Sequence, residues 1–536
     1  MANVNRTTMP VPSREIGFGS SRILSLPWIW ILPVVAMLAV TAFIILLRYF
    51  PYSKKKIVQS LQETFPSAIT IDHFQQVYFP HPGCKAEGIH FRAFSSPPES
   101  PPIVAIHELT IQGSYADFLF RPHHISKVLL NGLHLYFSPT NNTRTFSGGS
   151  TQTAITIGQL IADGAVMEVE RADKKPVLRF DFHELSLGSV SDKNGMSYSV
   201  AMHNPEPPAE IRSTGHFGPI NEKSAGLTPV SGKYTFDGGD LSMFEGIAGI
   251  VNSVGTFSGS LGEIHVQGVT DAPDFEVVRS GHSGPLHTGF QANVNGLNGD
   301  VVLTNVDATY IKTNIKAKGV IAEMDSSNGK YTSLDFVIAK GRIEDLLRLF
   351  VKENRPPMSG ITRMQGHVVL PPGGEPFLKK VTIQGDFGIE DGRFENWERQ
   401  ESVDELSETA RGKKKPKDQE KDSVENVISH VNGHTSLQNG VATFSGLGFQ
   451  VPGADASMHG TFNLLNQKVD LHGTVKMDAK FSQSTSGIKS LFAKVLNPFF
   501  DKNRGSVVPV LVDGTYQNPH FGLDLSPVKN KDGGAN

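Results

Sequence analysis

The clearest strand-and-turn pattern in this chain lies in residues 434–449, HTSLQNGVATFSGLGF, and residues 454–478, ADASMHGTFNLLNQKVDLHGTVKMD. In both stretches apolar and polar residues alternate, as in a strand with one apolar and one polar face. Asn439-Gly440 divides the first stretch, and Asn-Gly is the strongest short-range signal for a hairpin because both residues tolerate positive φ. The second stretch turns near Asn466-Gln467. Each stretch therefore predicts an antiparallel hairpin.

The same alternation extends through most of the 536 residues. It is clearest at 103–111, 177–187, 263–269, 299–311 and 379–389. The chain contains more than twenty candidate strands, and its 53 Gly and 33 Pro supply the turns between them. There is no βαβ rhythm. We expect a mainly β fold, in which an elongated, repetitive, curved antiparallel sheet forms a groove, with a few short capped helices and one C-terminal amphipathic helix.

Three short stretches interrupt the strand pattern, at 115–122, 238–250 and 341–352. Each places an Asp before a small apolar cluster. A carboxylate at that position accepts hydrogen bonds from the free N–H groups of a helix. We therefore expect Asp117, Asp240 and Asp345 to cap three short helices rather than to act as catalytic acids.

An uncharged run of 21 residues, PWIWILPVVAMLAVTAFIILL, extends from Pro27 to Leu47. As a helix it would span roughly 30 Å, the thickness of a bilayer core. The apolar run continues past the small residues at 40–42, so we expect an uncleaved anchor. Basic residues flank both ends, and charge alone leaves the orientation open. Residues 55–65 then predict a short helix, with apolar residues at helical spacing.

A second amphipathic helix is predicted near the C-terminus, in SGIKSLFAKVLNPFF. Its apolar positions recur at helical spacing and form one stripe. They are Ile488, Leu491, Phe492, Val495, Leu496 and Phe499. Such a stripe suits either a membrane surface or the end of a β-sheet, and we expect it to plug the sheet.

Several functional classes lack support in the sequence. Lys plus Arg is 50 against 53 for Asp plus Glu, so no overall basic field exists to bind nucleic acid. Cys84 is the single cysteine, which excludes a disulfide framework and Cys-rich metal sites. We find no phosphate-binding loop, dinucleotide fingerprint, zinc-protease motif or nucleophile elbow. We therefore assign no catalytic residue, no cofactor and no metal, and expect a protein that is not an enzyme.

An N-terminal anchor followed by hundreds of residues of alternating strands resembles the AsmA-like family, which is related to AsmA and TamB. VYFPHPGCKAEGIHFRAF (77–94) and 106–137 are similar to the family's N-terminal block. NGVATFSGLGFQVPGADASMHGTFNLLNQKVDLHGTV (439–475) is similar to its C-terminal domain, and 492–500 with 507–525 resembles the closing segment. The resemblance extends from about residue 30 to 525.

This resemblance implies an inner-membrane protein of a diderm bacterium, crossing once, with its C-terminal bulk in the periplasm. The expected parts are a cytoplasmic segment (1–26), a transmembrane helix (27–47), a repetitive β-groove region (54–395), a charged helix/loop insertion (396–426), an AsmA-like C-terminal domain (427–526) and a disordered tail (527–536). The implied partners are phospholipid, the inner membrane, and outer-membrane or periplasmic envelope proteins.

The function expected from the resemblance is transfer of phospholipid, or envelope lipid homeostasis, between the inner and outer membranes. A curved sheet can shield acyl chains on its apolar face, and burial gains about 0.8 kcal/mol for each methylene. The expected groove-lining residues are Phe444, Phe449, Val469, Leu471, Val475 and Met477. The alternative is a membrane-tethered scaffold that assists outer-membrane protein assembly. A scaffold should have a filled core, whereas a lipid conduit needs an open apolar face.

Overall fold

The structure is a computed structural model. It describes residues 37, 52–64, 67–93, 102–121, 124–137, 156–170, 176–191, 194–221, 224–244, 246–323, 330–352, 354–395, 400, 404, 407, 429–478, 506–522 and 524. The chain divides into two units, Met1–Ile57 and Val58–Asn536. In the first unit Met37 is helical and helix α2 (Lys54–Thr64) begins. This helix confirms the short helix predicted from residue 55.

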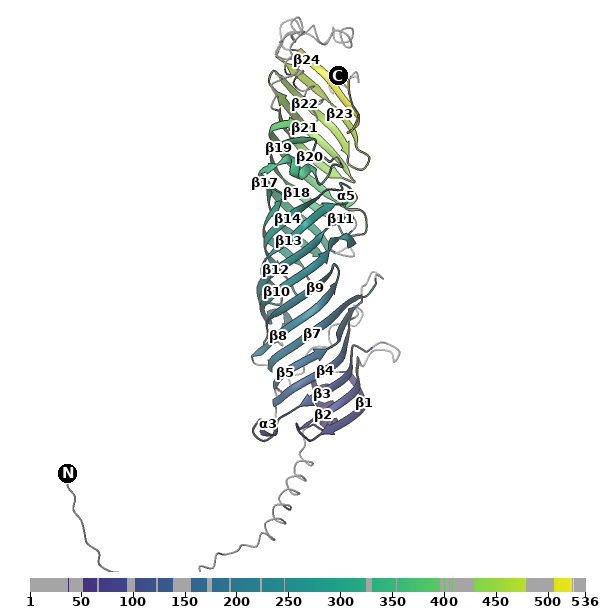
Figure 1. The fold of residues 1–536 in the computed structure, drawn as a ribbon, viewed down its shortest axis with the longest axis vertical. Coiled ribbons are helices and arrows are strands. Elements are labelled where there is room, and N and C mark those ends of the chain that lie inside the picture. The colour runs from purple at the N-terminus through teal and green to yellow at the C-terminus, as the bar shows by residue number, and fades with distance from the viewer. Residues whose placement is uncertain are drawn as a thin grey trace, which may run out of the picture. The chain divides into compact units, whose positions relative to one another are not determined.

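The second unit is built from one long, curved sheet of 25 strands (Figure 1). Its strands are β1 (Ser67–Val77), β2 (Gly83–Ala93), β3 (Val104–Gln112), β4 (His124–Phe137), β5 (Thr156–Asp163), β6 (Ala165–Val169), β7 (Leu178–Ser191), β8 (Gly195–Pro205), β9 (Pro208–Phe217), β10 (Pro229–Asp240), β11 (Ile247–Ala248), β12 (Ile250–Ser260), β13 (Glu263–Val277), β14 (Ser283–Val294), β15 (Val301–Tyr310), β16 (Thr313–Glu323), β17 (Lys330–Arg342), β18 (Met358–Leu370), β19 (Thr382–Phe394), β20 (Ser429–Gln438), β21 (Val441–Val451), β22 (Ala454–Asn463), β23 (Lys468–Met477), β24 (Ser506–Thr515) and β25 (Pro519–Gly522). The mainly β class is therefore confirmed.

The strands pair in chain order, and most neighbours are antiparallel. From β12 onward each strand pairs with the next, and β19 pairs directly with β20 across the charged insertion. One junction departs from the expected antiparallel pattern, because β5 and β6 both run parallel to β4. A two-residue hairpin can join only antiparallel strands. Residues 138–155, between β4 and β5, are numerous enough for β5 to start at the same edge of the sheet as β4. The sheet is therefore mixed.

Both predicted C-terminal hairpins are confirmed. Strands β20 and β21 are joined by Asn439 and Gly440, whose φ values of 52° and 74° are those of a type I′ turn. Strands β22 and β23 pair around the turn that ends at Gln467, whose φ is 60°. In both hairpins, the turn residues set the register of the two strands.

The predicted Asp caps are correct at one of three positions. Asp240 caps the 3-10 helix η3 (Leu241–Met243) by accepting from the Ser242 amide at 2.8 Å. Helix α3 (Tyr115–Phe120) is instead capped by Ser114, and Asp117 lies in its first turn, where it pairs with Arg121. Asp345 lies in the first turn of α4 (Ile343–Leu347). An acid in the first turn faces the positive end of the helix dipole but is not the cap. The remaining short helices are η2 (Ala225–Leu227) and α5 (Phe377–Lys380).

No helix within the described ranges has the length and apolarity needed to cross a bilayer. The predicted helix at 27–47 lies outside the described residues except for Met37, as do the segments 1–26 and 527–536. The predicted amphipathic helix with Ile488, Leu491, Phe492, Val495, Leu496 and Phe499 also lies outside them. Within the charged insertion 396–426, Gln400, Asp404 and Ser407 are described, and all three are helical and buried.

Candidate functional site

One face of the sheet is apolar from its first strands to its last, and we call it the apolar face. Residues that lie directly opposite each other on neighbouring strands point to the same side of a sheet. In the middle of the sheet, this relation links Phe257, Val266, Ala292 and Leu303, on β12 to β15. It links Ile71, Ile89, Ile106 and Leu133 at the first end, and Phe449, Ala456, Val475 and Val508 at the last.

On β12 to β15 the large side chains at the centre of the apolar face are half-buried, whereas Ala292 beside them and Ala272 and Tyr310 nearer one edge are buried. Phe257, Val266 and Leu303 remain half-buried although they lie far from either end of the sheet. By contrast, Ile89 is 0% exposed near the first end, and Val475 belongs to a buried cluster near the last. Large apolar side chains at the centre of a fold are normally fully buried. The described chain therefore has no second layer that packs fully against Phe257, Val266 and Leu303.

Aromatic rings lie along the apolar face, over glycines of neighbouring strands. A Cβ added at Gly232 would lie 2.9 Å from the Phe257 ring and 2.5 Å from the Tyr198 hydroxyl. A Cβ at Gly268 would lie 2.8 Å from the Tyr234 hydroxyl and 3.2 Å from Phe290. These glycines leave space for the rings to lie against the sheet instead of standing away from it. The space above the sheet is correspondingly less filled.

Two tyrosine hydroxyls on this face are paired with serine hydroxyls of neighbouring strands. The Tyr198 hydroxyl lies 3.1 Å from the Ser213 hydroxyl, and the Tyr234 hydroxyl lies 3.2 Å from that of Ser253. Ser253 in turn donates to the Val269 carbonyl at 3.0 Å. Burying a hydroxyl without a partner costs free energy, so this pairing allows tyrosine and serine to lie on a largely apolar surface.

The two edges of the sheet meet, and they curl toward the apolar face. Arg279, in the β13–β14 turn, donates from Nε to the Leu464 carbonyl at 3.3 Å. Leu464 lies in the β22–β23 turn, which is at the opposite edge of the sheet. Leu464 also packs against Leu437 and Ala442, whose side chains lie on the apolar face. Strands twist in one direction, and that twist accumulates along a long sheet until its edges approach. The apolar face is therefore concave.

All six predicted lining residues lie on the apolar face. Phe444 pairs with Gly460 and hence with Leu471, Phe449 pairs with Ala456 and hence with Val475, and Val469 and Met477 follow on β23. Val475 and Met477 are buried in a cluster against which Phe449 packs, whereas Phe444 packs against a second cluster around Val381. Val469 and Leu471 are half-buried. Whether any of the six binds lipid stays a prediction.

A bulge decides that Phe444 and Phe449 share a face. These residues are five positions apart, and strict alternation would place them on opposite faces. The register shifts between Phe444 and Leu447, and Gly446 has a φ of 62°. One extra residue in β21 restores Phe449 to the side of Phe444.

Four half-buried residues on this face, Phe257, Val266, Phe290 and Leu303, were missing from the predicted set. Val266 and Leu303 lie in the alternating stretches 263–269 and 299–311, whereas Phe257 and Phe290 lie in β12 and β14, outside the stretches named from the sequence. Their signal is the repeated placement of glycine opposite an aromatic residue on the next strand. That relation becomes visible only when the strands are aligned in register.

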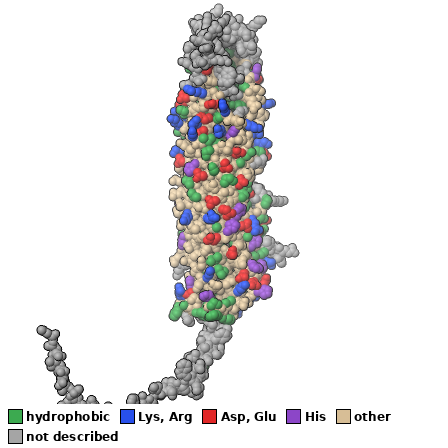
Figure 2. Space-filling model, viewed as in Figure 1, with side chains coloured by type: hydrophobic (Ala, Val, Ile, Leu, Met, Phe, Trp, Pro, Cys, Tyr) green, Lys and Arg blue, Asp and Glu red, His purple; other side chains and the backbone are tan. Residues whose placement is uncertain are grey.

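The opposite face is polar and carries charges of both signs (Figure 2). Histidines lie directly opposite carboxylates on it, with His287 2.5 Å from Asp271, His367 2.9 Å from Asp335, and His434 2.9 Å from Asp386. The hydrogen bond from His434 lowers the pKa of Asp386. Cross-strand pairs of this kind stabilise a sheet modestly and keep this face in water.

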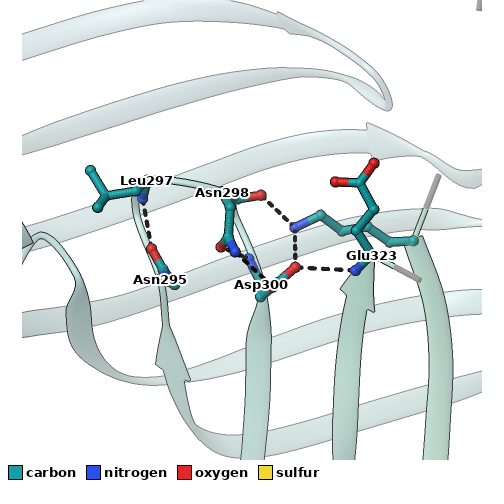
Figure 3. A network of polar contacts seen from close by, with 6 residues as sticks. Asn295, Leu297, Asn298, Asp300 and Glu323 are labelled. Carbon is teal, nitrogen blue, oxygen red and sulfur yellow. Dashed lines mark hydrogen bonds and ion pairs between the residues drawn. The ribbon is translucent and has the colours of Figure 1, made fainter. Parts of the chain in front are cut away.

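A polar network fixes the β14–β15 turn to the ends of the next strands (Figure 3). Asp300 accepts from the Glu323 amide at 3.2 Å and from Asn298 Nδ2 at 2.8 Å, and Lys330 Nζ lies 3.2 Å from it. Burial would raise the pKa of Asp300, but these hydrogen bonds outweigh it and the pKa is lowered. The network joins four consecutive strands at one edge.

In the described ranges, no group of three or more His, Cys, Asp or Glu is arranged to hold a metal ion. Cys84 is fully buried on the apolar face opposite Ile111, and burial raises its pKa to about 12. We therefore take the concave apolar face as the candidate functional site. No family model, curated protein or solved structure matches this chain.

Proposed function

We propose that the chain is an anchored envelope protein that shields the acyl chains of phospholipid on its apolar face. In this role it supports phospholipid transfer, or lipid homeostasis, between the inner and outer membranes. The observation that carries the proposal is the continuity of the apolar face from β1 to β24, with Phe257, Val266 and Leu303 at its centre left half-buried. The resemblance to the AsmA-like family supports the same role.

The energetics of this role need no specific polar residue. Each methylene removed from water contributes about 0.8 kcal/mol, so a chain of roughly sixteen carbons would gain on the order of 10 kcal/mol. At ~4.8 Å for each strand, the hydrogen-bonded path of the sheet is on the order of 100 Å long. A lipid could move along this face because neighbouring positions offer similar apolar contacts. The proposal requires neither a catalytic residue nor a cofactor.

The scaffold alternative predicts a different interior. A scaffold would be packed throughout, as the sheet is around Val451 and Val475 near its C-terminal end. The half-buried Phe257 and Phe290 in the middle favour lipid shielding over this alternative.

Photo-crosslinking from adjacent positions tests the proposal. A photoreactive residue at Phe290 would lie on the apolar face, and one at Gln291, exposed on the polar face, is the matched control. In bacterial membranes we expect phospholipid adducts from Phe290 and from the candidate Leu471, and few from Gln291. Equal adducts from both faces, or only protein adducts from Phe290, would overturn lipid shielding; the latter result would favour the scaffold.

A further inference from the structure

Two phenylalanines project into solvent near the first strand of the sheet. Phe79 in the β1–β2 turn is 83% exposed, and Phe120 at the end of α3 is 82% exposed. They are the two most exposed large hydrophobic residues in the described part of the chain. Single exposed aliphatic residues are ordinary, but two nearly bare aromatic rings are not.

The two segments that carry these rings are held together. The β1–β2 turn and the β3–β4 connection lie at the same edge of the sheet, because β1 to β4 are successive antiparallel strands. The Tyr115 hydroxyl, at the start of α3, donates to the Tyr78 carbonyl. Tyr115 is itself 38% exposed. Hydrophobic side chains gather at this end of the sheet, where α3 and the first strands lie (Figures 1 and 2). We call Phe79, Tyr115 and Phe120 the aromatic tip.

We propose that the aromatic tip inserts into the interface of the bilayer from which the chain emerges. Aromatic rings favour the boundary between headgroups and acyl chains, where an apolar ring and nearby polar backbone are both accommodated. Arg121 follows Phe120 and pairs with the buried Asp117, yet its side chain stays 67% exposed beside the ring. The proposal does not depend on whether the apolar face carries lipid.

The length of the chain favours a bilayer over another occupant. The uncharged run ends at Leu47, and β1 begins at Ser67. Helix α2 covers 11 of the residues between them and rises about 16 Å, and the other residues could add at most roughly 30 Å. Phe79 follows the far end of β1, which adds roughly 40 Å to this reach. If the run at 27–47 spans a membrane, the chain itself therefore keeps the aromatic tip within about 90 Å of that membrane's surface.

The test places one environment-sensitive probe at a time on the full-length protein. Phe79→Cys and Phe120→Cys are each labelled with a nitrobenzoxadiazole dye, while Cys84 stays unlabelled because it is fully buried. Leu297→Cys is the matched control, since Leu297 is 57% exposed in the β14–β15 turn. The labelled proteins are reconstituted into vesicles of phosphatidylethanolamine and phosphatidylglycerol that contain spin-labelled lipid.

We expect blue-shifted emission and severalfold stronger quenching by spin-labelled lipid at positions 79 and 120 than at 297. Equal, weak quenching at all three positions would overturn the proposal. A blue shift that depends on protein concentration and needs no vesicles would identify a second copy as the occupant, which also overturns it.

A second variant separates membrane insertion from a folding defect. A probe at His81→Cys, exposed beside Phe79, reports on the same turn. The double substitution Phe79→Ser and Phe120→Ser should abolish quenching at this probe while Cys84 stays unreactive, which shows that β1 to β4 remain folded. Undiminished quenching in the double variant would exclude the two rings as the inserting groups.

Discussion

Gly246, in the segment between η3 and β11, lies against Phe377 at the start of α5, and the contact has no room for a side chain. A Cβ built at Gly246 would lie 2.9 Å from the Phe377 Cβ and 3.1 Å from its backbone nitrogen. These residues belong to opposite edges of the sheet, as do Arg279 and Leu464. Figure 1 places β11 beside α5. The two contacts join the edges where the curled sheet returns on itself.

Replacing Gly246 by Ala should weaken this junction. The residue has a φ of 98°, so the substitution combines backbone strain with a steric clash, and we expect a loss of roughly 2–4 kcal/mol in unfolding free energy. Gly373→Ala is the control, because Gly373 has a φ of 117° but no atom within 4 Å of its added Cβ. Urea denaturation gives the unfolding free energy of both variants, and the difference between them measures the contribution of the contact. Equal losses of unfolding free energy would show that the junction of the two edges does not depend on this contact.

Asp345 should contribute to stability through a buried hydrogen bond. Its carboxylate is 5% exposed and accepts from the Thr313 hydroxyl at 2.9 Å and from the Lys312 amide at 3.1 Å. Removing the acceptor leaves buried donors unpaired, so Asp345→Ala should cost about 1–3 kcal/mol. A double-mutant cycle with Thr313→Val should give a coupling above about 0.5 kcal/mol. Asp335→Ala, at an exposed ion pair, should change stability by less than that amount.

His472 should make the stability of the C-terminal strands depend on pH. Its hydrogen bond to Asp524, 2.8 Å away, is the main cause of its raised pKa, and Asp470 adds to it. Because the folded pKa lies above the unfolded value of about 6.5, the stabilisation is complete below that pH and is lost as pH rises through the folded pKa.

The variant His472→Gln should therefore differ from the parent protein most at pH 6 and least at pH 9, in urea denaturation at low salt. His520→Gln removes a ring that is 74% exposed beside Asp513 and is the matched control, with a smaller effect expected. A His472→Gln effect that is constant between the two pH values would contradict the linkage.

Cys84 should report on the integrity of the first strands. Burial raises its pKa to about 12, so its thiolate fraction at pH 8 is about 10⁻⁴. Thiolate is the reactive species, and the site is also closed to solvent. We expect labelling by a disulfide reagent to be at least about 10³-fold slower in the native protein than in urea. Rapid native labelling would show that β2 and β3 open readily.

Local patterns along the chain are enough to predict the class of the fold and the two faces of its strands. Alternation assigns each side chain to a face, because successive residues of a strand point to opposite sides, and it placed Val469, Leu471, Val475 and Met477 on one side. The Asn439-Gly440 turn determined a hairpin, because few residues tolerate positive φ at both positions. These are local properties, and a short stretch of chain contains all the information they require.

The way in which the strands combine depends on contacts between residues far apart in the chain. The bulge near Gly446 brought Phe449 to the side of Phe444, and the return over 138–155 made one junction parallel. The contact of Arg279 with Leu464 joins residues 185 positions apart. It depends on twist accumulated over many strands, and small changes in each strand would move the edges apart. Which apolar residues are packed and which stay half-buried follows from that curvature, so alternation could identify the face but not its most open part.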